Sequence, residues 1–197
     1  MTTVFSSFAQ MAVRFMEMEG GLAMYLQDGL NKALGKIEHS AKDMLGHYQG
    51  SVGPFPAWAP LAESTMEERE HLGFPPDDPL YRLGELRDAI EREVDGLEGV
   101  VGVKGGRLHS PYIDNDGVVH GGDTEIGDIA LDQELGTLRI PPRPFLGPAA
   151  FLNKDAIQAL VGAALISGFV TQRTGASFIQ SVMPGWMGYE GETPDYR

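Results

Sequence analysis

Residues 132–150 read Asp-Gln-Glu-Leu-Gly-Thr-Leu-Arg-Ile-Pro-Pro-Arg-Pro-Phe-Leu-Gly-Pro-Ala-Ala, and this stretch decides how the chain is organised. It holds four prolines, two arginines and the apolar pair Phe145 and Leu146. Proline fixes φ and lacks a backbone N–H, so Pro-Pro-Arg-Pro neither continues a helix nor forms a central strand. The stretch is therefore predicted to run extended and to hold Phe145 and Leu146 as anchors, against the protein's own sheet and a neighbouring subunit.

The two arginines of this stretch, Arg139 and Arg143, have two interpretations of equal weight. In the first, each makes bidentate bonds to carboxylates of an adjacent copy of this acidic protein, which offsets part of the repulsion between copies. In the second, both pair within their own domain. The sequence does not separate the two.

Length and charge bound the class of protein. With 197 residues and 42% hydrophobic content, the chain is long enough for one domain with a core and an arm or two. A net charge of −13 argues against a protein that binds nucleic acid by neutralising phosphate, although DNA can pass such a surface without sticking. The chain has no cysteine, which excludes a disulfide-stapled scaffold.

No signal peptide opens the sequence, and the longest apolar run, residues 159–170, is shorter than the roughly 20 residues of a bilayer span. A soluble protein is therefore expected.

The first quarter of the chain, residues 4–47, carries apolar residues at alternating spacings of three and four, as on one stripe of a long helix. Gly20-Gly21 interrupts it, and two glycines cost about 2 kcal/mol of helix propensity, so two helices or a bend are expected. The stripe lies either on the chain's own domain or also on a neighbouring subunit.

Two short helices are predicted after a Gly/Pro-rich connector over residues 48–60. Capping-box spacing at Ser64-Glu67 and Thr65-Glu68 predicts a helix that ends near residues 72–73. Asp78 before Pro79 predicts a second helix over residues 79–90, with apolar residues on one face.

Strand patterns follow. Residues 91–94 and 99–103 around Asp95-Gly96 predict a hairpin, and residues 104–128 predict a long loop or a second protruding hairpin. A helical turn over 129–135 ends at Gly136, and residues 138–140 are expected to be extended. A last helix over 149–170 is expected to be buried on most sides, and residues 171–197 to form an arm on a neighbouring chain.

These elements predict an α+β fold in which N-terminal helices and a C-terminal helix pack on a small, mostly antiparallel sheet. One domain spans residues 1–170, with a helical segment over 4–47 and a core over 58–170, and the arm follows.

No catalytic pattern stands out. The five histidines lie in unrelated contexts without metal-ligand spacing, and Asp114-Asn115-Asp116-Gly117 lacks the closing glutamate of a calcium loop and is better explained as a turn. We expect no enzyme activity, no cofactor and no metal site. A hydrolase with an unrecognised site is a distant alternative.

Three separated pieces of sequence resemble a known family. They are Trp58-x-Pro60-Leu61 with Ser64-Thr65, then Pro79-Leu80-x-x-Leu83-Gly84-x-Leu86, then Glu134-x-Gly136 leading to Ile140-Pro-Pro-Arg-Pro-Phe-Leu. In this order they are similar to the neck or tail-completion proteins of tailed bacteriophages, also called the virion morphogenesis family. The resemblance covers roughly residues 58–160. Leu83 stands where threonine is usual in the family, and residues 104–128 look inserted.

The resemblance implies a structural virion protein of the head–tail junction (neck, tail completion or tail terminator) that forms a ring joining tail to capsid around the DNA channel. Its implied partners are further copies of itself and virion proteins on the portal or head-closure side and on the tail-tube side. DNA would pass the lumen without specific binding, and no membrane is involved. The implied location is the virion, and the host cytoplasm during assembly. The alternatives are a head-closure or adaptor ring, and an assembly factor or chaperone absent from the particle.

The residues expected to anchor packing or subunit contacts come from these pieces and from the arm. They are Trp58, Leu61, Leu83, Leu86, Arg139, Arg143, Phe145, Leu146, Phe178, Trp186 and Tyr189.

Overall fold

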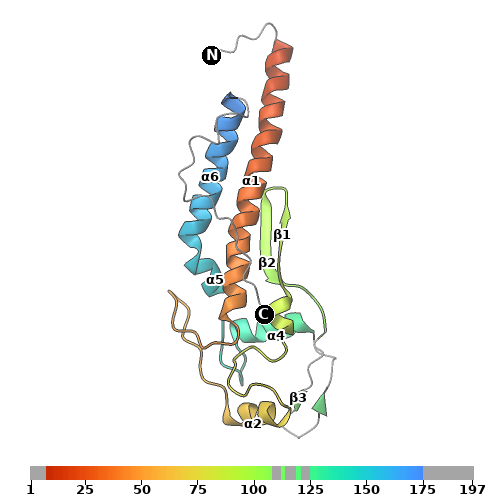
Figure 1. Ribbon diagram of the computed structural model, residues 1–197, viewed down its shortest axis with the longest axis vertical. Helices are drawn as coiled ribbons and strands as arrows, with labels where there is room; N and C mark the ends of the chain where they lie inside the picture. The colour runs from red at the N-terminus through yellow and green to blue at the C-terminus, as the bar shows by residue number, and fades with distance from the viewer. Residues whose placement is uncertain (1–7, 108–111, 114–118, 121–124, 175–197) are drawn as a thin grey trace, which may run out of the picture.

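The computed structural model describes residues 8–107, 112–113, 119–120 and 125–174, and it confirms the predicted α+β class. Two long helices form the upper part of the molecule in Figure 1, and shorter elements gather at its lower end. The helices are α1 (Phe8–Met44), α2 (Glu63–His71), α3 (Glu85–Asp88), α4 (Ile126–Leu135), α5 (Leu146–Leu152) and α6 (Lys154–Thr174). The strands are β1 (Ile90–Asp95), β2 (Glu98–Val103), β3 (Tyr112–Ile113) and β4 (Val119–His120), which pair as two antiparallel hairpins.

Helix α1 runs without interruption through Gly20-Gly21, so the predicted division into two helices is wrong. The physical reason is tertiary packing, because α6 lies alongside α1 as far as Leu22 and Tyr25, which contact Gly168. Burial against a second helix offsets the low helix propensity of the two glycines.

Glycine brings α1 and α6 close together. A Cβ atom at Gly29 would lie 2.4 Å from the Cβ of Ala164, and one at Gly168 would lie 2.7 Å from a methyl carbon of Leu22. Real Cβ atoms do not approach this closely, so Gly29, which faces a Cβ atom and the backbone of α6, requires the absence of a side chain, whereas at Gly168 the end of the Leu22 side chain would have to move. The last helix therefore packs mainly along α1 rather than on the sheet as expected.

The predicted hairpin over residues 91–103 is confirmed. Strands β1 and β2 pair from Ile90↔Val103 to Asp95↔Glu98, and Gly96 in the turn has φ of +58°. The hairpin lies against α1 (Figure 1), and a Cβ at Gly99 would lie 2.4 Å from Leu34 on α1. The strand thus contacts the helix directly through its backbone.

The insertion over residues 104–128 contains the second hairpin, β3 with β4, in the part that the structure describes. Helix α4 begins at Ile126, three residues before the predicted helical turn, and ends as predicted before Gly136. Gly136 has φ of +75°, a conformation that favours glycine.

The predicted helix over residues 79–90 is wrong, since only the single turn α3 forms there. Leu80 and Gly84 have φ of +60° and +88°, which no helix permits. The guanidinium of Arg69 donates to the carbonyl oxygens of Asp78 and Tyr81 and so takes acceptors that a helix would use.

The predicted capping boxes at the start of α2 are also wrong. The N-cap residue is Ala62, whose carbonyl accepts bonds from the N–H groups of Thr65 and Met66, and no side chain caps the helix. The carboxylate of Glu68 binds Arg82 instead. Glu68 thus forms an ion pair with a residue 14 positions away and does not cap the start of α2.

Residues 138–140 form a tight turn rather than the expected extended run. The N–H of Thr137 donates to the carbonyl of Ile140 (2.8 Å), and the Thr137 hydroxyl accepts from the N–H groups of Arg139 and Ile140. Local side-chain bonding of this kind competes with strand formation.

The single last helix predicted over residues 149–170 is two helices, α5 and α6, divided at Asn153. The Asn153 amide donates to Ser40 on α1 and to the carbonyl of Ala149. The prediction that this helix is buried on most sides is wrong for the chain by itself, because Leu165, Ile166 and Phe169 are exposed. Helix α6 continues to Thr174, beyond the expected start of the arm at residue 171.

The core lies where the lower end of α1 meets the shorter elements. Phe145, Ile90 and Pro79 are its largest fully buried side chains. The core cluster comprises Ala41, Met44, Leu45, Trp58, Leu86, Ile90, Ile126, Ala130, Phe145 and Ala149.

Candidate interaction site

A buried hydrogen bond joins the two most distant pieces of the family-like sequence. The indole N–H of Trp58 donates to the carbonyl oxygen of Pro144 over 2.9 Å, and the Trp58 side chain is buried. Its own backbone N–H donates to the carbonyl of Gln49. The connector after α1 and the proline stretch are thereby held together in the core.

Arg143 strengthens this connection. Its Nε donates to the carbonyl of Ala59 (3.2 Å) and its Nη2 to that of Pro60 (3.0 Å), while its backbone N–H donates to Gln133. Burial lowers the pKa of the Arg143 guanidinium, which nevertheless stays cationic. Of the two interpretations of this arginine, the contacts match bonding within its own domain, to carbonyls and not to a carboxylate.

Glu134 orients the chain that follows the prolines. Its carboxylate accepts bonds from the backbone N–H groups of Phe145 (2.7 Å), Leu146 (3.0 Å) and Gly147 (2.8 Å), at the start of α5. A carboxylate satisfies donors that a helix leaves unpaired at its N-terminus and is favoured by the helix dipole. Sequence reasoning missed this role, because cap patterns are sought three residues apart and here the partners are 11 to 13 positions apart.

Arg69 on α2 is a second buried arginine that sequence reasoning missed. Its side chain is 6% exposed, and it donates to backbone carbonyls of the segment before α3. Its Nε has no hydrogen-bond partner among the described residues. Burial, followed by the charge of Arg82, lowers the pKa of the Arg69 guanidinium. No residue near it in the sequence signals that it turns inward.

All three family-like pieces line one cavity of about 580 Å³, a volume within the range of small-molecule and cofactor pockets. The first piece contributes Pro60 and Leu61, and the second contributes residues 80 and 83–86. The third contributes residues 139–141 and Arg143. Segments separated by more than 50 residues therefore converge on a single hollow, which we call the arginine cavity.

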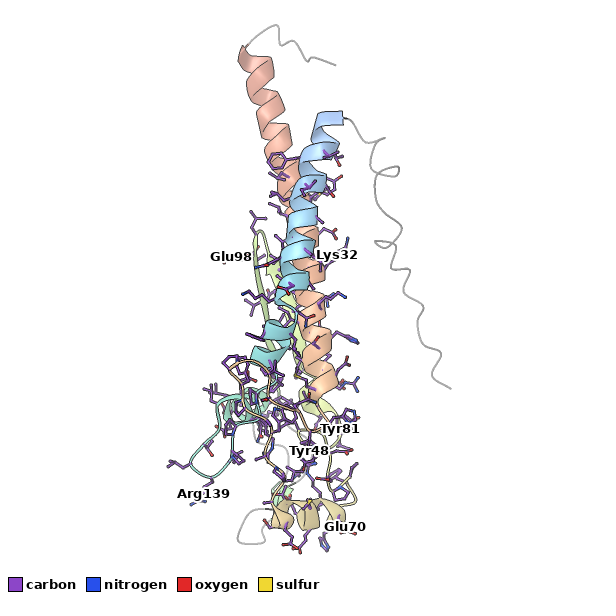
Figure 2. All side chains as sticks on the ribbon, turned by 90° about the vertical axis from the view of Figure 1, so that its left-hand side faces the viewer. Lys32, Tyr48, Glu70, Tyr81, Glu98 and Arg139 are labelled. Carbon is purple, nitrogen blue, oxygen red and sulfur yellow. The ribbon has the colours of Figure 1, made fainter. Side chains whose placement is uncertain are left out.

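The arginine cavity is positive in an otherwise acidic protein. Four of the chain's 15 basic residues line it, against two glutamates, and its walls are otherwise mainly apolar. The four are Arg69, Arg82, Arg139 and Arg143. Arg82 is paired with Glu68, whereas Arg139 is exposed on the loop that projects from the lower body in Figure 2. Such a surface suits an occupant with both apolar and acidic groups.

The structure brings together most of the predicted anchors. Trp58, Leu86, Arg143 and Phe145 are buried, and Leu146 packs partly against the core. Leu61, Leu83 and Arg139 line the arginine cavity, where Leu83 is 59% exposed. Phe178, Trp186 and Tyr189 lie outside the described residues, as does the candidate cation loop at 114–117. Within the described ranges, no group of three or more His, Asp or Glu side chains is arranged to hold a metal ion.

Helix α6 presents a second surface of interest. Its outer face exposes Leu165, Ile166 and Phe169 (39%, 64% and 52%). Residues 154–171 are long and apolar enough to cross a membrane by length and composition alone, although the core helix of a soluble protein passes the same test. In this chain the helix packs along α1 through the glycine contacts described above.

No protein-family model, curated protein or solved structure matches this chain.

Proposed function

We propose that this protein is a structural subunit of the head–tail junction of a tailed bacteriophage, a neck or tail-completion protein that assembles into a ring joining the tail to the capsid. The observation that carries the proposal is the convergence of the three family-like pieces on one interlocked cluster. Trp58 donates a hydrogen bond to Pro144 and Arg143 donates one to Ala59, so the first and third pieces are bonded to each other. Leu83 and Gly84 of the second piece line the same cavity. The pieces that carry the resemblance therefore act as one structural unit, which supports the proposal.

The exposed apolar surface of the protein supports the proposal that it is a subunit of a larger assembly. Beyond α6, the described part of the chain exposes large apolar side chains at α5 and around the end of α4: Leu131, Leu135, Leu138, Phe151 and Leu152. Contiguous apolar surface on a protein typically marks an interaction site. Neighbouring copies in a closed ring would cover such faces through a heterologous interface, in which two different surfaces of each copy meet.

Charge supports the placement around DNA. A net charge of −13 repels phosphate, so a ring of these subunits would let DNA slide without holding it. The arginine cavity does not alter this, because its two buried guanidiniums are engaged with backbone carbonyls.

The oligomeric state of the full chain tests the proposal. We expect native mass spectrometry to give one fixed oligomer and negative-stain microscopy to show a central hole. A chain that stays monomeric at micromolar concentration would contradict the ring. Detection of the protein in purified particles separates a virion subunit from an assembly factor, which would be missing there. Recovery of the protein in the membrane fraction would favour insertion of α6 instead.

A further inference from the structure

The arginine cavity combines two properties that call for a particular kind of occupant. Its lining carries an excess of two positive charges in a chain of net charge −13, and its apolar walls include Leu61, Leu83 and Ile140. An occupant that fits must offer carboxylates together with large apolar or aromatic groups.

One segment of this chain outside the described residues has that chemistry. Residues 186–196 read Trp-Met-Gly-Tyr-Glu-Gly-Glu-Thr-Pro-Asp-Tyr. They contain three aromatic rings, three carboxylates and no basic residue. Aromatic side chains fill apolar pockets at low entropic cost, and carboxylates form bidentate pairs with arginine.

The geometry favours a cavity on a neighbouring copy. In Figure 1, the end of α6 lies at the opposite end of the molecule from α2 and α4, which flank the cavity. Helix α6 has 21 residues and is therefore about 31 Å long. Residues 175–185 span at most about 38 Å when fully extended, so a return to the chain's own cavity leaves almost no slack. If copies stand head to tail, the end of α6 of one copy faces the cavity end of the next.

We propose that residues 186–196 of one copy dock in the arginine cavity of the next copy. The inference rests on the proposed ring, and it identifies the contact that closes it. Recognition comes from the aromatic rings of Trp186 and Tyr189 on the apolar walls and from acidic side chains at Arg139.

Disulfide cross-linking tests the contact cleanly, because the natural chain has no cysteine. Two full-length single-cysteine variants are co-expressed, Thr65→Cys on the cavity wall and Thr193→Cys in the docking segment. Mild oxidation should give a covalent heterodimer of the two variants, and a different affinity tag on each variant separates it from the homodimers that each single-cysteine chain can form with itself. The matched control pairs Thr193→Cys with Lys32→Cys, an exposed position on α1 in the upper half of Figure 2. We expect about tenfold more dimer from the cavity pair than from the control.

The outcomes separate this inference from the proposed function. A ring in native mass spectrometry with no dimer above the control overturns the docking and leaves the ring standing. A monomeric protein overturns both. If a chain that carries both Thr65→Cys and Thr193→Cys cross-links only within itself, docking between copies is wrong.

A charge exchange tests the chemistry of recognition. Arg139 is exposed, so Arg139→Glu should leave the fold intact and lower the dimer yield about fivefold. Glu192→Arg in the partner chain should restore it. Arg87→Glu, an exposed arginine on α3 outside the cavity, is the control. An equal effect of Arg87→Glu and Arg139→Glu would refute recognition by charge in the cavity.

Discussion

The indole N–H of Trp58 and the carbonyl oxygen of Pro144 form a 2.9 Å hydrogen bond across 86 positions of sequence. Proline stretches lack N–H groups and cannot hold themselves in a sheet, so they must be fixed by donors from elsewhere. Trp58 supplies such a donor to Pro144, and Arg143, within the stretch, donates in turn to the carbonyls of Ala59 and Pro60. The path of the proline stretch is therefore set by long-range bonds, and the fold of one piece depends on the other.

Replacement of Trp58 by phenylalanine tests this bond. Trp58→Phe keeps an aromatic ring in the core but leaves the carbonyl of Pro144 without a donor, which we expect to cost about 1 to 3 kcal/mol of unfolding free energy. Urea denaturation of the full chain, followed by circular dichroism, measures the loss. A change below about 0.5 kcal/mol would show that the bond contributes little.

Phe145 should be the more sensitive position. Its ring is fully buried, so Phe145→Ala is expected to cost about 3 to 5 kcal/mol through lost burial and the cavity left behind. Phe151→Ala provides the comparison, because Phe151 is 49% exposed and should cost clearly less. Equal losses for the two variants in denaturant unfolding would contradict the assigned core.

Glu134→Gln removes the charge that caps α5. The glutamine keeps one acceptor oxygen for three N–H groups, and we expect a loss of about 2 kcal/mol. Glu70→Gln, at an exposed position labelled in Figure 2, is the neutral comparison. Thermal unfolding of the two variants side by side gives the difference, and indistinguishable midpoints would refute the cap.

Two glycines in the paired helices should respond to alanine in opposite directions. Gly29→Ala forces α1 and α6 apart and is expected to destabilise the protein by about 1 to 3 kcal/mol. Gly162→Ala meets no atom within 4 Å and should stabilise by about 0.5 to 1 kcal/mol through helix propensity. Chemical denaturation decides, and a stabilising Gly29→Ala would mean that the helices are not in close contact.

The charge cluster between α1 and β1 predicts a dependence on pH. Partial burial by itself would raise the pKa of Glu38, but hydrogen bonds and charges from Lys42 and Arg92 outweigh it and lower that pKa below its usual value. A carboxyl with a lowered pKa stabilises the fold at pH values above its unfolded pKa, near 4.3, and loses that contribution as pH falls through the folded value.

Glu38→Gln should therefore be less stable than the natural protein by about 1 kcal/mol at pH 7, and the difference should shrink as the pH falls through the lowered pKa of the folded state. Glu91→Gln is the control, because Glu91 and Lys104 form an exposed pair of small effect. Unfolding curves at several pH values test this, and a difference that does not shrink as the pH falls would exclude the charge as its cause.

Sequence reasoning predicted the elements that local chemistry determines. The hairpin follows from Gly96 between two strand-like runs, and the end of α4 follows from Gly136. It failed where distant partners decide. Residues 79–90 have a helical pattern, yet Arg69 binds the carbonyls of Asp78 and Tyr81 and fixes a loop there. A contact of this kind leaves no local pattern.

The candidate site was predictable in its parts and not in its arrangement. The proline stretch and the Trp58 segment stand out in the sequence, but the inward orientation of Arg69 and the reach of Glu134 do not. At Gly20-Gly21 the local pattern predicts a break in the helix, but α1 continues there, because packing against α6 overrides the low helix propensity of the two glycines.

The walls of the arginine cavity come from segments that meet only when the chain is folded. An occupant of the cavity binds the native state and not the unfolded chain, so it shifts the folding equilibrium by mass action. If that occupant belongs to the next copy, each subunit gains stability from its neighbour, and an unassembled copy is the least stable form. Folding and assembly then become a single linked equilibrium, and incomplete rings are the species exposed to proteolysis.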